Sequence, residues 1–91
     1  MSEEEKRKKA VALKYEVGSD AAPRVTAKGT GRIALKIIEL ATANNIPIHE
    51  DPDLTEVLSR VELGEEIPED VYTVVAEILA FIYQANKKYP T

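Results

Sequence analysis

The sequence of 91 residues contains no cysteine, no tryptophan and a single histidine. The absence of cysteine excludes a disulfide framework, a thiol nucleophile and thiolate metal ligands. With one phenylalanine and four tyrosines, the aromatic side chains are too few to fill a core, so aliphatic residues must fill it. No apolar run approaches the ~18 residues that a bilayer-spanning helix needs, and the charged start SEEEKRKK does not resemble a signal peptide. Together, these absences predict a cytoplasmic protein.

What is present fits one small globular domain. Apolar residues make up 44% of the chain and charged residues 31%, a composition that supports a core and argues against disorder. Domains typically span about 100–150 residues, so a chain of this length holds one. We place a charged N-terminal arm at residues 1–9 and the domain at residues 10–88.

The net charge of −4 is unevenly distributed along the chain. Residues 1–36 hold nine basic and five acidic side chains, whereas residues 50–70 hold nine acidic side chains with Arg60 as the single base. Such a division can mark an electrostatic docking surface. The alternative, which we favour, is a solvated surface whose acids lie at the starts of helices, where the helix dipole stabilises them.

Hydrophobic periodicity predicts a fold with both strands and helices. Residues 10–15 alternate in the manner of a strand with one buried face, and residues 24–28 form a second short strand. A helix follows residues 29–31 and ends near residues 44–45, after which residues 46–48 form a third strand. Strand, helix and strand in this order indicate a right-handed parallel βαβ unit. The expected fold class is α/β, with a small mixed sheet of three or four short strands packed against about three helices.

Two further helices have clear start signals. Asp51-Pro52 is an N-cap followed by proline at the first helical position, and Pro68 with two acids begins the last helix, which should end near Lys88. The last helix is apolar on two stripes. The first stripe holds Val71, Val74, Val75, Ile78, Phe81 and Ile82, and the second holds Tyr72, Ala76, Leu79 and Tyr83. One stripe must pack on the sheet, and the other either packs on a helix, which we favour, or lines an exposed groove.

No catalytic constellation emerges from the sequence. His49 lies near Glu50, Asp51 and Asp53, but a single imidazole without cysteine is weak evidence for zinc, and the acids are explained as helix-start residues. Residues 29–31 lack the third glycine of a dinucleotide loop and the lysine of a P-loop, so a plain helix entry is the better interpretation. We therefore predict no enzymatic activity, no metal site and no cofactor.

Six segments, in this order and at this spacing, resemble the C-terminal cytoplasmic domain of the FlhB family, the switch component of flagellar and related type III protein export. They are AVALKY (10–15), AAPRVTAKG (21–29), IALKIIELA (33–41), NNIPIHEDPDL (44–54), LGEEIPEDVY (63–72) and VAEILAFIY (75–83). Any one segment would be weak evidence, but the set covers residues 10–83 almost without a gap. The family's small mixed sheet surrounded by helices agrees with the fold expected from periodicity.

One departure from the family pattern bears on function. In the family, an Asn-Pro-Thr-His motif stands just before the segment that AVALKY resembles, and it self-cleaves when the asparagine cyclises. The corresponding positions here are Glu5, Lys6, Arg7 and Lys8, so the nucleophile is missing. The resemblance therefore implies a short, stand-alone counterpart of the domain that lacks the autocleavage motif.

The resemblance implies a non-enzymatic interaction module of the bacterial flagellar (type III) protein export apparatus. In the family, a hydrophobic pocket for early export substrates lies beside the segment that matches Ala22 and Pro23, and the last helix, where Ala76 and Leu79 match, forms its other wall. The expected partners are export apparatus proteins, early rod and hook substrates, and the membrane-bound half of a full-length FlhB. The expected location is the cytoplasm, with recruitment to the inner-membrane export gate.

A second hypothesis is a small regulatory or nucleic-acid-binding protein that uses the basic N-terminal third. The acidic composition and the lack of aromatic residues among the lysines argue against nucleic acid as a partner. An enzyme built on His49 is the weakest of the three hypotheses.

The first strand is expected to have an unpaired edge. In the family, the segment before Asn-Pro-Thr-His supplies a strand, and the equivalent stretch here is charged. We predict edge-strand pairing at Val11, Leu13 and Tyr15, by a partner's strand or a second copy of the chain. The alternative is that Lys9 and Lys14 defend this edge with charge. The chain is accordingly expected to be a monomer or a weak dimer.

Overall fold

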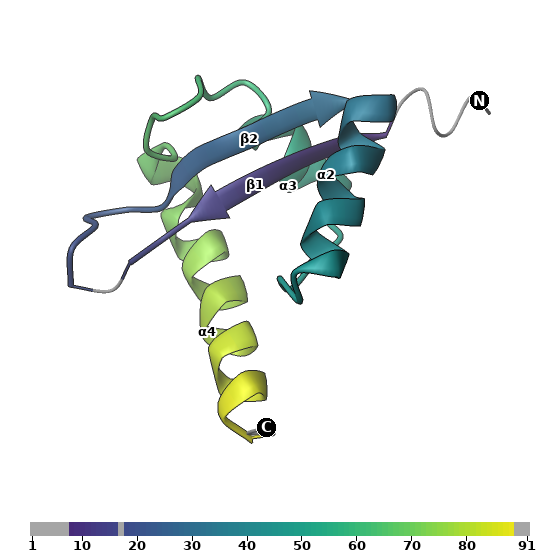
Figure 1. Ribbon diagram of the computed structural model, residues 1–91. Coiled ribbons are helices and arrows are strands. Elements are labelled where there is room, and N and C mark those ends of the chain that lie inside the picture. Colours follow the sequence, from purple (N-terminus) through teal and green to yellow (C-terminus); the bar gives the residue numbers. More distant parts are fainter. Residues whose placement is uncertain (1–7, 17, 89–91) are drawn as a thin grey trace.

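The structure of the chain, a computed structural model, describes residues 8–16 and 18–88. The elements in order are β1 (Lys9–Lys14), β2 (Arg24–Thr30), α2 (Arg32–Ala43), α3 (Pro52–Leu58), the 3-10 turn η1 (Glu69–Val71) and α4 (Tyr72–Lys88). Figure 1 shows α2 in front of the two strands and α3 and α4 behind them. Most of the predicted N-terminal arm, residues 1–7, lies outside the described residues.

The two strands predicted from alternation are confirmed, and they pair antiparallel. The register runs from Lys9 opposite Thr30 to Lys14 opposite Arg24. It shifts between Ala12 and Leu13, where Thr26 is the extra residue of a bulge in β2. The second strand continues one residue past Gly29 before the helix begins.

The predicted third strand and parallel βαβ unit are wrong. Residues 46–48 form no strand, and the sheet of the described residues has two antiparallel strands rather than the three or four expected. Ile46 and Ile48 are 57% and 48% exposed, so they have no buried face to hold them against the sheet. Pro47 also lacks the amide hydrogen that a ladder requires. The α/β class itself holds, with fewer strands.

A different segment pairs with the outer edge of β2. The Gly64 amide donates to the Val25 carbonyl at 2.7 Å, and the Val25 amide donates to the Glu65 carbonyl at 3.0 Å. The Ile67 amide donates to the Pro23 carbonyl at 2.9 Å, and Arg24 and Glu66 form an isolated bridge. Residues 64–67 thus provide backbone partners for the start of β2, although the sequence analysis assigned no strand to them.

The core lies between the sheet and the two helices behind it. Val25, Leu58, Ile67 and Val75 are its buried centre, one residue from each of four segments. Val11, Leu13, Leu54, Val61, Val71 and Leu79 pack around them, half-buried. The core is wholly aliphatic, as the scarcity of aromatic residues predicts. On the other side of the sheet, Ala34 of α2 is completely buried.

The predicted helix starts are confirmed. The Asp51 side chain accepts a hydrogen bond from the Leu54 amide at 3.1 Å, with Pro52 at the first helical position. At the last helix, Pro68 precedes a first turn that holds Glu69 and Asp70. Helix α2 begins after Gly31, whose φ of 62° and ψ of −122° suit only glycine. These local signals set the angles at which the helices meet the sheet.

Candidate functional site

The basic and acidic segments of the chain meet in the folded protein. The Lys9 ammonium lies 2.5 Å from the Glu56 carboxylate, and Arg24 lies 3.9 Å from Glu66. The Lys28 ammonium donates to the carbonyls of Ser59 and Val61, at 3.1 and 2.7 Å. These carbonyls lie just after α3, where the helix dipole favours a cation. Part of the charge asymmetry therefore serves internal pairing, and three basic groups of the N-terminal third are engaged within the chain.

The Lys9–Glu56 pair predicts a specific pH dependence. The hydrogen bond and charge of Lys9, aided by Arg60, hold the pKa of the Glu56 carboxyl below its usual value of 4.5, with partial burial opposing them. A carboxyl with a lowered folded-state pKa contributes stability above its unfolded pKa, and this contribution is lost as the pH falls through the folded-state value. We expect stability at pH 5 to 7 that declines below about pH 4.5.

Urea unfolding at a series of pH values measures this contribution. Glu56→Gln and Lys9→Met should each flatten the decline below about pH 4.5, because either change removes the interaction that lowers the pKa. A decline as steep in both variants as in the wild-type protein would contradict the assignment.

The four predicted groove residues differ sharply in exposure. Ala22 is 2% exposed and Pro23 is also buried, whereas Ala76 is exposed and Leu79 is half-buried against the core cluster. Pro23 connects to that cluster through its hydrogen bond with Ile67. Both predicted walls thus adjoin the same core, and the groove itself stays a prediction.

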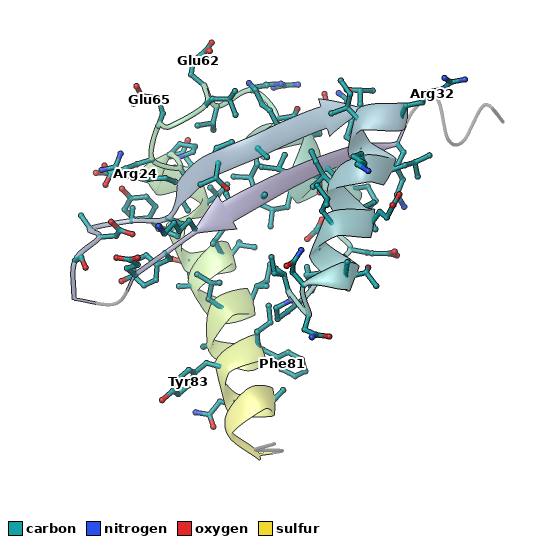
Figure 2. All side chains as sticks on the ribbon, in the orientation of Figure 1. Arg24, Arg32, Glu62, Glu65, Phe81 and Tyr83 are labelled. Carbon is teal, nitrogen blue, oxygen red and sulfur yellow. The ribbon has the colours of Figure 1, made fainter. Side chains whose placement is uncertain are left out.

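Neither predicted stripe of α4 faces the core as a whole. The buried side of the helix combines Val75 from the first stripe with the half-buried Leu79 from the second. Exposed apolar side chains lie on both sides of it. Val74 and Phe81, 43% and 74% exposed, are on one side, and Tyr72 and Tyr83, 37% and 64% exposed, are on the other. Figure 2 shows Phe81 on the side of α4 toward α2 and Tyr83 on the opposite side.

The exposed end of α4 was missed by the sequence analysis, which placed Phe81 on a packed stripe. The signal that could have found it is helix length. Seventeen residues of α-helix extend roughly 25 Å, whereas two strands about 5 Å apart offer a far narrower surface. The C-terminal half of α4 therefore projects beyond the sheet (Figure 1).

The other candidate chemistry finds no geometric support among the residues that the structure describes. His49 lies in an exposed, irregular segment, and no group of three or more His, Asp or Glu side chains is arranged to hold a metal ion. No helix in this part of the chain combines the length and apolar character needed to cross a bilayer. One hollow is lined by side chains of both charges and a hydroxyl group, from Lys14, Glu16, Asp20, Arg24 and Thr26.

Comparison with known proteins identifies the family. The sequence profile of the FlhB HrpN YscU SpaS Family matches residues 7–82. The chain belongs to this family. It is 44% identical over 78 residues to the flagellar biosynthetic protein FlhB of Escherichia coli, covering 85% of this chain and 20% of FlhB. It is 42% identical over 87 residues to YlqH of Bacillus subtilis, covering 96% of this chain and 94% of YlqH.

Solved structures of the family share the fold. The cytoplasmic domain of FlhB from Shewanella putrefaciens superimposes with a TM-score of 0.81 and 40% identity, over 88% of this chain and 66% of that one. The C-terminal domain of PscU gives a TM-score of 0.77 and 29% identity, over 81% and 95% of the two chains. The chain spans about a fifth of the FlhB proteins that it matches, and nearly the whole of YlqH. The family resemblance stated from the six segments is confirmed.

Proposed function

We propose that this FlhB-family chain acts as a non-enzymatic interaction module of the flagellar, type III protein export apparatus. The observation that carries the proposal is family membership, with 44% identity to a domain of a flagellar biosynthetic protein. The module works in the cytoplasm and is recruited to the inner-membrane export gate. Its partners are export apparatus proteins, including the membrane-bound half of a full-length FlhB, and early rod and hook subunits.

The proposed docking surface lies along one side of α4. It consists of the exposed side chains of Tyr72, Ala76 and Tyr83, with the half-buried Leu79 at its base. Their spacing of three or four residues puts them on one face of the helix. Ala22 and Pro23 are buried, so in this proposal they support the core beneath the surface and do not contact the partner. An apolar helix face of this kind suits an amphipathic partner segment.

The sharpest test uses a residue that the core does not need. Leu79→Asp is unsuitable because Leu79 packs against the core cluster, so lost binding would be confused with lost folding. Ala76→Asp adds a charge at the centre of the exposed surface. Phe81→Asp, at a 74% exposed position on the opposite side of the same helix from Tyr83, is the matched control (Figure 2).

Binding of the purified variants to early rod and hook subunits is the measurement. We expect Ala76→Asp to weaken binding at least about tenfold, because a buried, unpaired carboxylate costs more than 1.4 kcal/mol. Phe81→Asp should bind like the wild-type chain, and helix content by circular dichroism should be equal in all three. Equal binding by both variants would refute the proposed surface, and no binding of any export component by the wild-type chain would refute the function.

A further inference from the structure

The outer edge of β1 offers a row of backbone hydrogen-bonding groups. Among the described residues, β1 pairs with β2 alone. Val25 directs both its amide and its carbonyl away from β1, to Glu65 and Gly64. Opposed residues of an antiparallel pair exchange either both backbone bonds or neither, so Leu13, opposite Val25, directs its own two groups away from β2.

The other end of β1 shows that successive residues alternate in the direction of their backbone groups. The Lys8 carbonyl accepts from the Gly31 amide at 2.8 Å, so the even-numbered residues face β2. Lys9, Val11 and Leu13 therefore present their amides and carbonyls at the free edge. No proline interrupts residues 9–15, and Ala10 and Ala12 are small. The edge has regular strand backbone without proline, as pairing with a second strand requires.

Part of the charge that would defend this edge is paired within the chain. Lysine on an edge strand ordinarily discourages pairing. Here the Lys9 ammonium is bound by the Glu56 carboxylate, and Lys14 lies 3.4 Å from Glu16. On the core side, Phe81 projects from α4 toward α2, below this edge in Figure 2, and is 74% exposed.

We propose that two copies of this chain pair through β1, antiparallel, with the two-fold axis at Ala12. A two-fold axis perpendicular to the sheet keeps each side chain on its own face, so an odd-numbered residue lies opposite an odd-numbered one. With the axis at Ala12, Val11 lies opposite Leu13 of the second copy, and Lys9 lies opposite Tyr15. Val11 and Leu13 have backbone groups that face the edge, so each Val11–Leu13 pair exchanges two hydrogen bonds.

Side-chain chemistry favours this register over the one with its axis at Val11. With the axis at Ala12, Lys8 lies opposite Glu16 of the second copy at both ends, and Lys9 lies against the Tyr15 ring. With the axis at Val11, Lys8 would lie opposite Lys14, and like charges directly opposite are destabilising. Of these two registers, only the one with its axis at Ala12 places opposite charges across from each other.

Single cysteines test the register, because the chain has no native cysteine. Ala12 would form a non-hydrogen-bonded pair with itself, with Cα atoms about 4.5 Å apart, which lies within the range that a disulfide bridges. We expect Ala12→Cys to form a covalent dimer on mild oxidation at least about tenfold faster than Ser19→Cys, an exposed loop control. Cross-linking of Val11→Cys in preference to Ala12→Cys would overturn the register.

Light scattering on the cysteine-free chain tests the dimer itself. We expect a mass that rises from 10.1 kDa toward twice that value with concentration. Lys8→Glu should shift the protein to monomer, and the exchange Lys8→Glu with Glu16→Lys should restore the dimer, with circular dichroism unchanged throughout. A monomer at every concentration, or no recovery in the double variant, would overturn the proposal. Since these readouts involve no export component, they are independent of the proposed function.

Discussion

Gly29→Ala is expected to destabilise the protein by about 2–3 kcal/mol, because the added methyl group overpacks the junction of β2 and α2. A Cβ atom at Gly29 would lie 2.1 Å from Cγ2 and 2.7 Å from Cβ of Ile33. The Ile33 side chain cannot simply move aside, since β-branched residues in a helix have one strongly preferred rotamer. The first turn of α2 must shift instead. For a domain of this size the loss corresponds to roughly 10–20 °C in Tm.

Calorimetry on a double-mutant cycle isolates this contact. Ile33 is 62% exposed, so Ile33→Ala alone should cost little. In the Gly29→Ala background, Ile33→Ala removes the clashing Cγ2 atom and should restore at least about 1 kcal/mol of the free energy of unfolding. At a position without such a contact, Gly→Ala commonly stabilises by about 0.4–1 kcal/mol through the unfolded state. A Gly29→Ala variant more stable than the wild-type protein would therefore contradict the account.

Ile67→Ala is the second substitution with a large expected effect, and it should lower the free energy of unfolding by about 2–5 kcal/mol. Ile67 is 2% exposed, belongs to the buried centre of the core, and donates its amide to the Pro23 carbonyl. Truncating it removes packing at the point where residues 64–67 join the edge of β2. Urea unfolding measures the loss, and Ile67→Val should lose only about 0.5–1.5 kcal/mol.

Ile48→Ala is the matched control, because it makes the same substitution in the segment that periodicity assigned to the sheet. Ile48 is 48% exposed and lies outside any strand. Its truncation should change stability by less than about 0.5 kcal/mol. If Ile48→Ala proved as costly as Ile67→Ala, residues 46–48 would belong to the core after all.

The contrast between Ile48 and Ile67 shows where sequence reasoning succeeds and where it stops. Both isoleucines adjoin a proline, but Ile48 lies in the apolar segment Ile46-Pro47-Ile48. Ile67 has two acidic residues before it and two more after Pro68, so the local pattern favoured the wrong segment. Their environments differ because residues 64–67 reach the open edge of β2, a long-range relation that local patterns do not encode. By contrast, the Asp51 cap and the Pro68 start are local, and both were predictable.

The candidate site was predictable to a similar extent. Residues along α4 were identified from their spacing and from the family resemblance. Their exposure depended on the width of the sheet, so Phe81 was placed on an apolar stripe expected to pack, although it is 74% exposed. Ala22 and Pro23 were expected to line a groove, and both are buried. Burial depends on which segments pack together, and the two-stranded sheet was not foreseen.

Co-purification from the native host tests the central claim, that this chain binds the export apparatus through α4. The tagged wild-type chain and its Ala76→Asp variant would be captured after cross-linking in cells, and the bound proteins identified by mass spectrometry. The account predicts that type III export components are enriched with the wild-type chain and depleted at least about tenfold with the variant. Equal recovery of these components with both chains, or their absence from both, would contradict it.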